Sequence, residues 1–244
     1  MRSLYDIHGH FLPGMDDGCK TAEESIEVLR QAKEQGVQVM FATPHYYPVE
    51  SIEAFLHRRT AAVERLKQAM GDAPEETFPK ICLGAEVELR PGLSSDPMLE
   101  RLCLGGTRYL LTELPWGGWG SDILRELRNL GVSCGITPVM AHLERYVSMA
   151  GWRAVAQVLE QDVLVQVNAG SFLRFADRQA VKKILRYGGI HLLGADCHNL
   201  TTRRPNMDLA AAYMEKHGLK AVLEQTCAFG AQIYEESNDQ YRVR

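Results

Sequence analysis

The sequence predicts an α/β fold in which seven parallel strands alternate with helices and close into a barrel. Short apolar runs recur along the whole chain, and segments with the apolar spacing of helices lie between them. The number and length of the runs favour a closed barrel over an open doubly wound sheet. A chain of 244 residues is long enough for one such barrel, so we expect residues 1–244 to form a single domain.

The expected strands are short apolar segments bounded by turn residues. The first alternates apolar and polar residues, and the others are mainly apolar runs. The seven strands are expected at residues 4–10, 37–42, 81–88, 109–113, 134–141, 163–167 and 191–194.

The helices are predicted from their end signals and their apolar spacing. Thr21 and Glu24 form a capping box that begins a helix, and Gly36 ends it. A second helix is expected from Ser51 to about Met70. The remaining helices are expected in a short segment around Leu99 and at residues 122–130, 152–159, 177–187, 207–217 and 220–234. We expect the polar tail after residue 236 to be frayed.

Composition excludes several classes of protein. The chain is 45% hydrophobic and 24% charged, with a net charge of -4. It therefore lacks the excess of positive charge that is typical of proteins that bind nucleic acid or an acidic membrane surface. The six cysteines are scattered without a C-x-x-C pair. No signal peptide opens the chain, and no apolar run approaches the roughly 18 residues of a membrane span. We therefore expect a reduced, cytoplasmic protein without an integral membrane segment.

Two histidines in the first strand indicate a metal site. Residues i and i+2 of a strand point to the same face, so His8 and His10 aim their rings at one place. Two neutral imidazoles that converge are a natural start for a transition-metal site. Taken alone, an H-x-H pair in a strand is more often one packed and one exposed histidine.

Further polar side chains follow the other predicted strands. The C-terminal ends of parallel barrel strands meet at one face, so these side chains are expected to gather there. They are His8, His10, His45, Glu86, Glu113, His142, Asp196 and His198, with Asp16 and Asp17 in the first loop. Buried polar groups need partners, and carboxylates and imidazoles satisfy one another around cations, so the set predicts a multi-metal site.

Six segments, in this order, resemble the PHP superfamily. Within it they are similar to the bacterial manganese-dependent tyrosine-protein phosphatases associated with capsule and exopolysaccharide biosynthesis. The segments are DIHGHFLPGMDDG (6–18), ATPHY (42–46), GAE (84–86), TPVMAHLERY (137–146), QVNAGS (166–171) and DCHN (196–199). The likeness extends from about Leu4 to Pro205 and leaves only the C-terminal helices without a motif.

The resemblance implies a distorted seven-stranded (β/α) barrel, TIM-like, with three metal ions at the C-terminal ends of its strands. It implies that the first ion is held by His8, His10, Glu86 and Asp196. Glu86 would bridge to a second ion completed by Glu113 and His142. The third ion would be held by Asp17, His45 and His198. Family resemblance favours manganese, although imidazole–carboxylate sites also accept iron and zinc.

The resemblance also implies the reaction. Arg145 and Arg203 match family arginines that hold the substrate phosphate, and arginine suits bidentate contacts to phosphate. Metal-activated hydroxide would hydrolyse phosphotyrosine, and Asp17 or Glu113 would assist proton transfer. The expected partner is a phosphotyrosine protein, a bacterial tyrosine kinase, in the regulation of capsule or exopolysaccharide synthesis. The sequence leaves open whether the protein forms a homo-oligomer. Leu143 and Ala195 replace a common proline and serine without removing a ligand.

The sequence is also compatible with other functions, some of which its residues disfavour. The alternative within the superfamily is a phosphoesterase for a small substrate such as histidinol phosphate. Amidohydrolases also begin with H-x-H, but they typically use a lysine at a strand end, which this chain lacks. A silent metal-binding or regulatory module is the alternative outside enzymes, and no expected ligand is missing to favour it.

Two further features of the sequence have competing interpretations. Residues 197–203 fit the C-x5-R pattern of thiol phosphatases, but that loop has no glycine and Cys197 lies between two expected ligands. The aromatic residues Tyr46, Tyr47, Trp116 and Trp119 are candidates to border a phosphotyrosine-binding mouth, or else to pack beneath loops or at a subunit contact.

Overall fold

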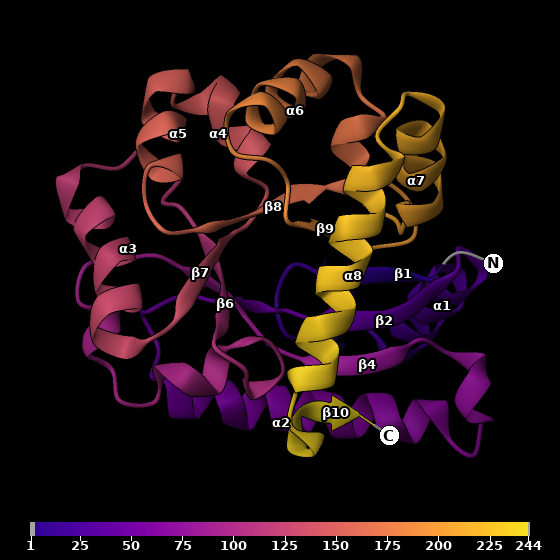
Figure 1. Ribbon diagram of the computed structural model, residues 1–244. Helices are drawn as coiled ribbons and strands as arrows, with labels where there is room; N and C mark the ends of the chain where they lie inside the picture. Colours follow the sequence, from indigo (N-terminus) through magenta and orange to yellow (C-terminus); the bar gives the residue numbers. More distant parts are fainter. Residues whose placement is uncertain (1–2, 244) are drawn as a thin grey trace.

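Parallel strands alternate with helices in the computed structural model, which describes residues 3–243 (Figure 1). The predicted parallel α/β fold is confirmed. The strands are β1 Leu4–Gly9, β2 Val37–Ala42, β3 His45–Tyr46, β4 Lys80–Leu83, β5 Glu86–Glu88, β6 Tyr109–Glu113, β7 Thr137–Met140, β8 Leu164–Asn168, β9 Leu192–Gly194 and β10 Arg242–Val243. The α-helices are α1 Ala22–Glu34, α2 Ile52–Met70, α3 Ser121–Cys134, α4 Leu143–Met149, α5 Trp152–Leu159, α6 Phe175–Tyr187, α7 Met207–Lys216 and α8 Lys220–Glu236.

The strands form two sheets, because the second and third strand segments of the chain are each interrupted. One sheet has the order β1-β2-β4-β10 and the other β3-β5-β6-β7-β8-β9. Pro44 separates β2 from β3 and has no N–H for a strand ladder. Gly84 and Ala85 separate β4 from β5, so the prediction of one strand over residues 81–88 was wrong. The Gly84 N–H still donates to the Ala42 carbonyl, at 2.9 Å, so the two interrupted segments stay side by side.

The two sheets curl so that the first and last parallel strands also meet. The Asp196 N–H donates to the His8 carbonyl at 2.8 Å, and the His10 N–H donates to the Cys197 carbonyl at 2.9 Å. An inner apolar cluster fills the curl. It includes Ile7, Val39, Phe41, Leu111, Val139, Leu192 and Ile233. The curled parallel sheet is thus established, and the closed seven-stranded barrel stays a prediction.

Helix α8 closes the inner cluster at the start of β1, and Figure 1 shows it crossing in front of β1 and β2. A Cβ at Gly230 would lie 2.7 Å from Tyr5 Cβ, so glycine lets α8 approach the strand closely. The larger apolar cluster lies between the strands and the outer helices. The functional end of the sheet, with His8 and His10, is therefore opposite to the end that α8 covers.

The C-terminal tail is ordered by contacts that sequence reasoning did not foresee. Residues 242–243 pair antiparallel with Ile81 and Cys82 of β4, so the prediction of a frayed tail was wrong. The Arg242 guanidinium donates to the carbonyls of Tyr234 (2.8 Å), Glu235 (3.3 Å) and Ser237 (2.9 Å), which are orphan acceptors at the end of α8. A 3-10 helix, Leu99–Leu102, stands where a short helix was expected.

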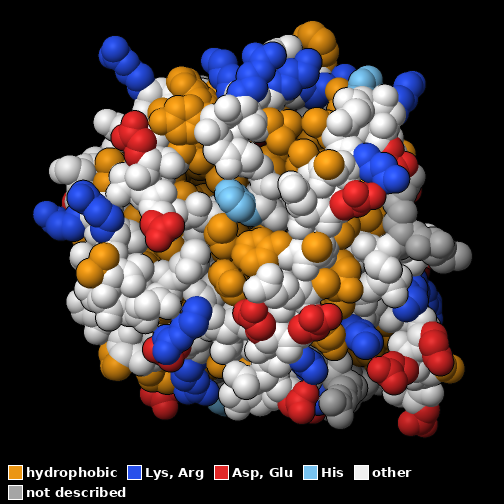
Figure 2. Space-filling model, in the orientation of Figure 1, with side chains coloured by type: hydrophobic (Ala, Val, Ile, Leu, Met, Phe, Trp, Pro, Cys, Tyr) orange, Lys and Arg blue, Asp and Glu red, His pale blue; other side chains and the backbone are white. Residues whose placement is uncertain are grey.

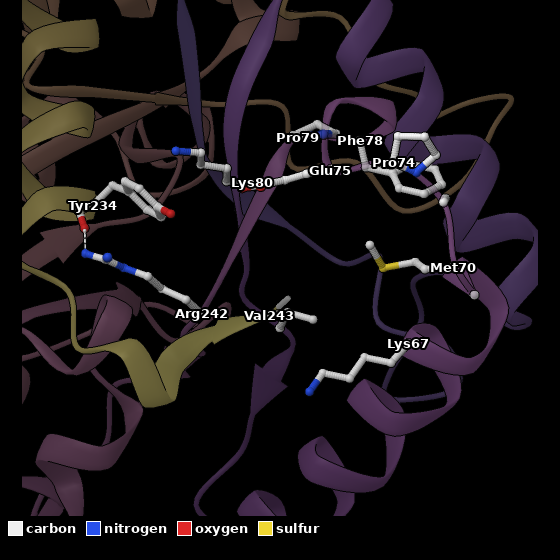
Figure 3. A pocket seen from close by; sticks show the side chains of 12 residues that line it. Lys67, Met70, Pro74, Glu75, Phe78, Pro79, Lys80, Tyr234, Arg242 and Val243 are labelled. Carbon is white, nitrogen blue, oxygen red and sulfur yellow. Dashed lines mark hydrogen bonds between the residues drawn. The ribbon is translucent and has the colours of Figure 1, made fainter.

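A cavity of about 450 Å³ lies between the C-terminal end of α2 and the tail (Figure 3). Its lining includes Lys67, Lys80 and Arg242, which would suit an anion, together with Glu75 and the Tyr234 ring. The Arg242 guanidinium is already engaged by carbonyls at the end of α8, as the dashed line in Figure 3 indicates for Tyr234. None of the residues that line the cavity is an expected metal ligand, so the cavity is separate from the predicted site.

One face of the molecule carries no single dominant charge. On the face shown in Figure 2, basic and acidic side chains are interspersed, with basic ones gathered along the upper edge over α6. Over residues 3–243, none of the helices combines the length and the apolar character that a membrane crossing needs.

Candidate metal centre

A β-bulge in β1 places both histidines of the first strand on the inner side of the sheet. Asp6 pairs with Met40 and Gly9 with Ala42, so β1 has one more residue than β2 between these two pairs. A bulge puts two successive residues on one face and changes the direction of the side chains after it. His8 therefore joins the inner side with Ile7, and His10 lies there as well; both histidines are buried.

Strained backbone marks two other strand ends. Over residues 3–243, His142 (φ 35°) and Asp196 (φ 52°) are the non-glycine residues with positive φ, a conformation that costs free energy and is concentrated at functional sites. Asp196 lies two residues after Gly194, where a Cβ would lie 2.4 Å from His8 Cβ. Glycine at this position lets the end of β9 approach the first strand closely.

The buried carboxylate of Glu86 is the centre of the site. Its Oε2 lies 3.1 Å from the Nε2 atoms of His8 and His10 and 3.1 Å from His45 Nδ1, while its Oε1 lies 2.7 Å from His142 Nε2. The Nε2 atoms of His8 and His10 are themselves 3.1 Å apart. Neighbouring donors on a cation that binds them at about 2.1 Å are separated by about 3 Å. The spacing therefore suits divalent cations between these side chains.

All nine expected ligands belong to overlapping groups whose donor atoms lie within 4.8 Å of one another. The groups are His10–Asp17–His45–His198, His8–Glu86–His142, His8–His10–Asp196 and His45–Glu86–Glu113. The structure thus brings the whole expected set together. His8, His10, His45 and Glu86 each belong to two groups, whereas the resemblance implies three ligand sets in which only Glu86 is shared.

Several buried atoms at the centre lie close to other polar atoms of the cluster without forming a hydrogen bond of good geometry, which supports the fit to cations. They are His45 Nδ1, Glu86 Oε2, Glu113 Oε2 and His198 Nε2. A buried polar group without a partner costs about 1–3 kcal/mol, and four in one place are difficult to explain by packing. Imidazole nitrogens and carboxylate oxygens are the donor types that manganese, iron and zinc accept.

The electrostatics of the cluster show how closely its charges interact. Burial alone would lower the pKa of His10, but the Asp16 and Glu86 carboxylates outweigh it and raise the pKa to about 10. Burial opposes ionisation of Glu86, yet the surrounding imidazoles, His8 first, hold its pKa well below the usual range. Burial and the Glu86 charge raise the pKa of Glu113 to about 8. Cations displace such protons, because imidazoles and carboxylates ligate in their deprotonated forms.

A buried amide pair connects three of the expected ligands. Gln166 Oε1 accepts the His142 backbone N–H at 2.7 Å and lies 3.2 Å from His8 Nδ1. Gln166 Nε2 donates to Asn168 Oδ1 at 2.9 Å, and Asn168 Nδ2 donates to Asp196 Oδ2 at 2.8 Å. A proton on His8 Nδ1 leaves Nε2 free for a cation. Sequence reasoning assigned no role to either amide.

Asp16 performs a similar task for His10. Its Oδ2 lies 2.8 Å from His10 Nδ1 and accepts the His45 backbone N–H at 2.8 Å, and its Oδ1 accepts the Gly18 N–H at 2.9 Å. This carboxylate fixes the His10 ring with Nε2 toward the cluster. Asp17, the expected ligand next to it, is 62% exposed, and its Oδ1 lies 3.2 Å from His198 Nε2. Asp17 thus stands at the outer edge of the site.

The two expected phosphate arginines meet at Asp196. Arg145 Nη2 lies 2.6 Å from Asp196 Oδ2, and Arg203 Nη2 lies 2.7 Å from Asp196 Oδ1. Both side chains are partly exposed, at 26% and 34%, so their guanidinium groups border the cluster from the solvent side. The loop that carries Arg203 is folded by Asn199, whose Oδ1 accepts the backbone N–H groups of Thr201 and Arg203 at 3.0 Å.

Comparison with known proteins places this arrangement in a family. The family model for capsular polysaccharide synthesis proteins, CpsB/CapC, matches residues 4–231. The chain belongs to the CpsB/CapC family. The tyrosine-protein phosphatase CpsB of Streptococcus agalactiae serotype III (strain NEM316) is 30% identical over 224 residues, which cover 86% of this chain and 88% of that protein. The tyrosine-protein phosphatase YwqE of Bacillus subtilis (strain 168) is 28% identical over 87% of this chain and 84% of its own length.

A solved structure confirms the fold of this CpsB/CapC member. It comes from work on YwqE from Bacillus subtilis and CpsB from Streptococcus pneumoniae, described there as unique metal-dependent tyrosine phosphatases. The TM-score is 0.81 with 24% sequence identity, and the match covers 96% of each chain.

The cysteine of the C-x5-R match is unsuited to thiol chemistry in this CpsB/CapC chain. Cys197 is fully buried. Burial, reinforced by the Asp6 charge, raises the pKa of its thiol well above the usual range. A nucleophilic cysteine needs a lowered pKa and access to its substrate, so the geometry agrees with setting the thiol mechanism aside.

The four aromatic candidates divide into two pairs. Tyr46 is 3% exposed, and its hydroxyl donates to the Glu50 carbonyl. Trp119 is partly buried with its ring edge-on to Tyr146, at 5.5 Å between centroids. These two residues pack beneath loops and do not border an open mouth. Tyr47 and Trp116 are 41% and 54% exposed at the edge of the cluster.

Proposed function

We propose that this CpsB/CapC protein is a metal-dependent phosphatase that hydrolyses phosphotyrosine in proteins and regulates capsule or exopolysaccharide synthesis. The observation that carries the proposal is the convergence of nine imidazole and carboxylate side chains on one buried place bordered by two arginines. Relatives at 28–30% identity that are named tyrosine-protein phosphatases support the substrate.

The ligands in this proposal are His8, His10, Asp17, His45, Glu86, Glu113, His142, Asp196 and His198. Bound divalent cations supply Lewis acidity and a nucleophile at neutral pH. We propose manganese, three ions per chain, on family resemblance; the donor set also suits iron and zinc.

The side chains around the centre have separate tasks. Arg145 and Arg203 release Asp196 in part and donate to the phosphate oxygens, in bidentate contacts that orient the phosphorus and balance its charge. Glu113, in the His45–Glu86–Glu113 group, is proposed to assist proton transfer as a carboxylate, because a bound cation displaces its proton. Asp17, at the exposed edge, is the alternative for this role.

We propose that the two sheets form one distorted seven-stranded barrel, since hydrogen bonds join β1 to the segment after β9. Residues 1–244 then form one domain, because His8 and Asp196, from opposite ends of the chain, meet in one site. Six free cysteines support a reduced, cytoplasmic location. The proposed partner is a bacterial tyrosine kinase that carries phosphotyrosine.

The competing function is hydrolysis of a small phosphoester such as histidinol phosphate. The test is to measure kcat/KM of the manganese-loaded protein for a phosphotyrosine peptide and for histidinol phosphate. We expect the peptide to be preferred. Preference for histidinol phosphate would keep the metal centre and overturn the substrate.

A further inference from the structure

Two aromatic rings stand beside the metal centre, and cluster side chains hold both. Trp116 lies in the loop after β6 and Tyr47 directly after β3, and about half of each residue is exposed to solvent. Exposed aromatic rings next to a polar site are available to contact an aromatic ligand.

Trp116 is fixed by hydrogen bonding and by the packing of its loop. Its indole N–H donates to Glu113 Oε1 at 3.0 Å, and its ring centroid is 6.5 Å from that of His142. The same loop is anchored at Tyr146, whose hydroxyl donates to the Leu114 carbonyl at 2.8 Å and whose ring contacts Trp119. The Trp116 ring is therefore prearranged, which limits the entropy that a ligand must remove on binding.

Tyr47 is held from another side of the cluster. Its ring stacks on that of His45, with centroids 5.2 Å apart and planes at 21°. His45 contacts one oxygen of Glu86, and His142, the neighbour of Trp116, contacts the other. The two aromatic side chains are thus attached to imidazoles that meet different oxygens of the same carboxylate.

We propose that Trp116 and Tyr47 form two walls of a slot that holds the aromatic ring of an aryl phosphate while its phosphate lies at the cluster. This inference rests on the proposed phosphatase function and names what would make it selective. An aryl ring gains contact with both walls, whereas the short chain of an alkyl phosphate such as phosphoserine reaches neither face fully. Trp116 and Tyr47 are therefore specificity residues for aryl over alkyl phosphates.

The test compares substrates that differ in the ring but have leaving groups of similar acidity. These are phenyl phosphate and a fluorinated alkyl phosphate whose alcohol is about as acidic as phenol. In Trp116→Leu and in Tyr47→Leu, the aryl-to-alkyl ratio of kcat/KM is expected to fall roughly threefold to tenfold, mainly through KM. Trp116→Phe and Tyr47→Phe keep a ring and are expected to hold the ratio within about twofold.

A matched surface variant and a binding measurement separate the ring from other effects. Tyr187→Leu removes a 49% exposed tyrosine that packs on Trp152, and it is expected to leave the ratio unchanged. Binding of phenylphosphonate and of inorganic phosphate to the manganese-loaded protein gives a readout without turnover. The Leu variants are expected to weaken phenylphosphonate binding more than phosphate binding.

The outcomes distinguish this inference from the function on which it rests. An unchanged ratio in both Leu variants overturns the slot, even if the wild type hydrolyses phosphotyrosine. A Trp116→Phe variant that loses as much ratio as Trp116→Leu also overturns it, because the indole N–H and not the ring face would then matter. Hydrolysis of neither substrate by the wild type overturns the slot and the phosphatase function together.

Discussion

Replacing Gln166 by methionine is expected to weaken both the fold and the metal centre. Methionine has a similar volume, but it leaves the buried His142 N–H and the His8 Nδ1 atom without their acceptor, which lies 2.7 Å and 3.2 Å away. Each stranded buried donor costs about 1–3 kcal/mol, so we expect the free energy of unfolding in chelator to fall by about 3 kcal/mol. Loss of the partner that orients His8 is expected to lower manganese affinity tenfold to hundredfold, which is about 1.4–2.7 kcal/mol.

The assay for this variant has two parts. Urea unfolding in the presence of chelator measures stability, and titration against a competing metal indicator measures affinity. Gln161→Met is the matched control, because the Gln161 side chain donates to the Gln157 carbonyl in a solvent-exposed hydrogen bond, and a change below about 0.5 kcal/mol is expected. If Gln166→Met left both stability and manganese affinity like the control, the proposed amide support of the ligands would be refuted.

In a urea titration, Arg242→Ala should lower the free energy of unfolding by about 1–3 kcal/mol, because the carbonyls that end α8 lose their donor. The control is Arg153→Ala, at an exposed position of α5, which should change the free energy of unfolding by less than about 0.5 kcal/mol. Cys197→Ser should retain most of the kcat/KM for a phosphotyrosine peptide, and a collapse of activity would revive the thiol mechanism. Burial lowers the pKa of His191, whose Nδ1 accepts the Val165 N–H at 3.0 Å. The unfolded chain therefore takes up the His191 proton first as pH falls through about 6.5, and the fold loses stability. In chelator, the stability of the wild type relative to His191→Asn should thus decrease between pH 7 and pH 5; a constant difference would refute this assignment.

The location of the site could be predicted from the sequence because it follows a general rule of parallel α/β folds. Functional side chains of parallel barrels gather at the C-terminal ends of strands, and His45, Glu113 and His142 each follow an apolar run. His8 and His10 were expected on one face from alternation alone. They do share a face, but the bulge between Asp6 and Gly9 decides which face of the sheet it is. A bulge has no clear signal in a single sequence, so this face could not be predicted.

The rest of the site depends on contacts between distant residues. The glutamine at position 166 looks like any polar residue in a buried strand until His8 and His142 are placed against it. The tail at Arg242 was predicted as frayed because its partner strand lies far earlier in the chain, at Cys82. The break between β4 and β5 had a local signal, Gly84, which favours interruption of a strand.

The measurement that tests the central claim most directly is a manganese titration of metal-stripped protein. Bound metal per chain and hydrolysis of a phosphotyrosine peptide would be followed in the same samples. We expect no turnover without metal, turnover that rises with bound manganese, and saturation at three ions per chain. In His142→Ala and Asp196→Ala, we expect both the turnover and the binding of three ions to be lost. Full turnover by protein from which all metal has been removed would contradict the account.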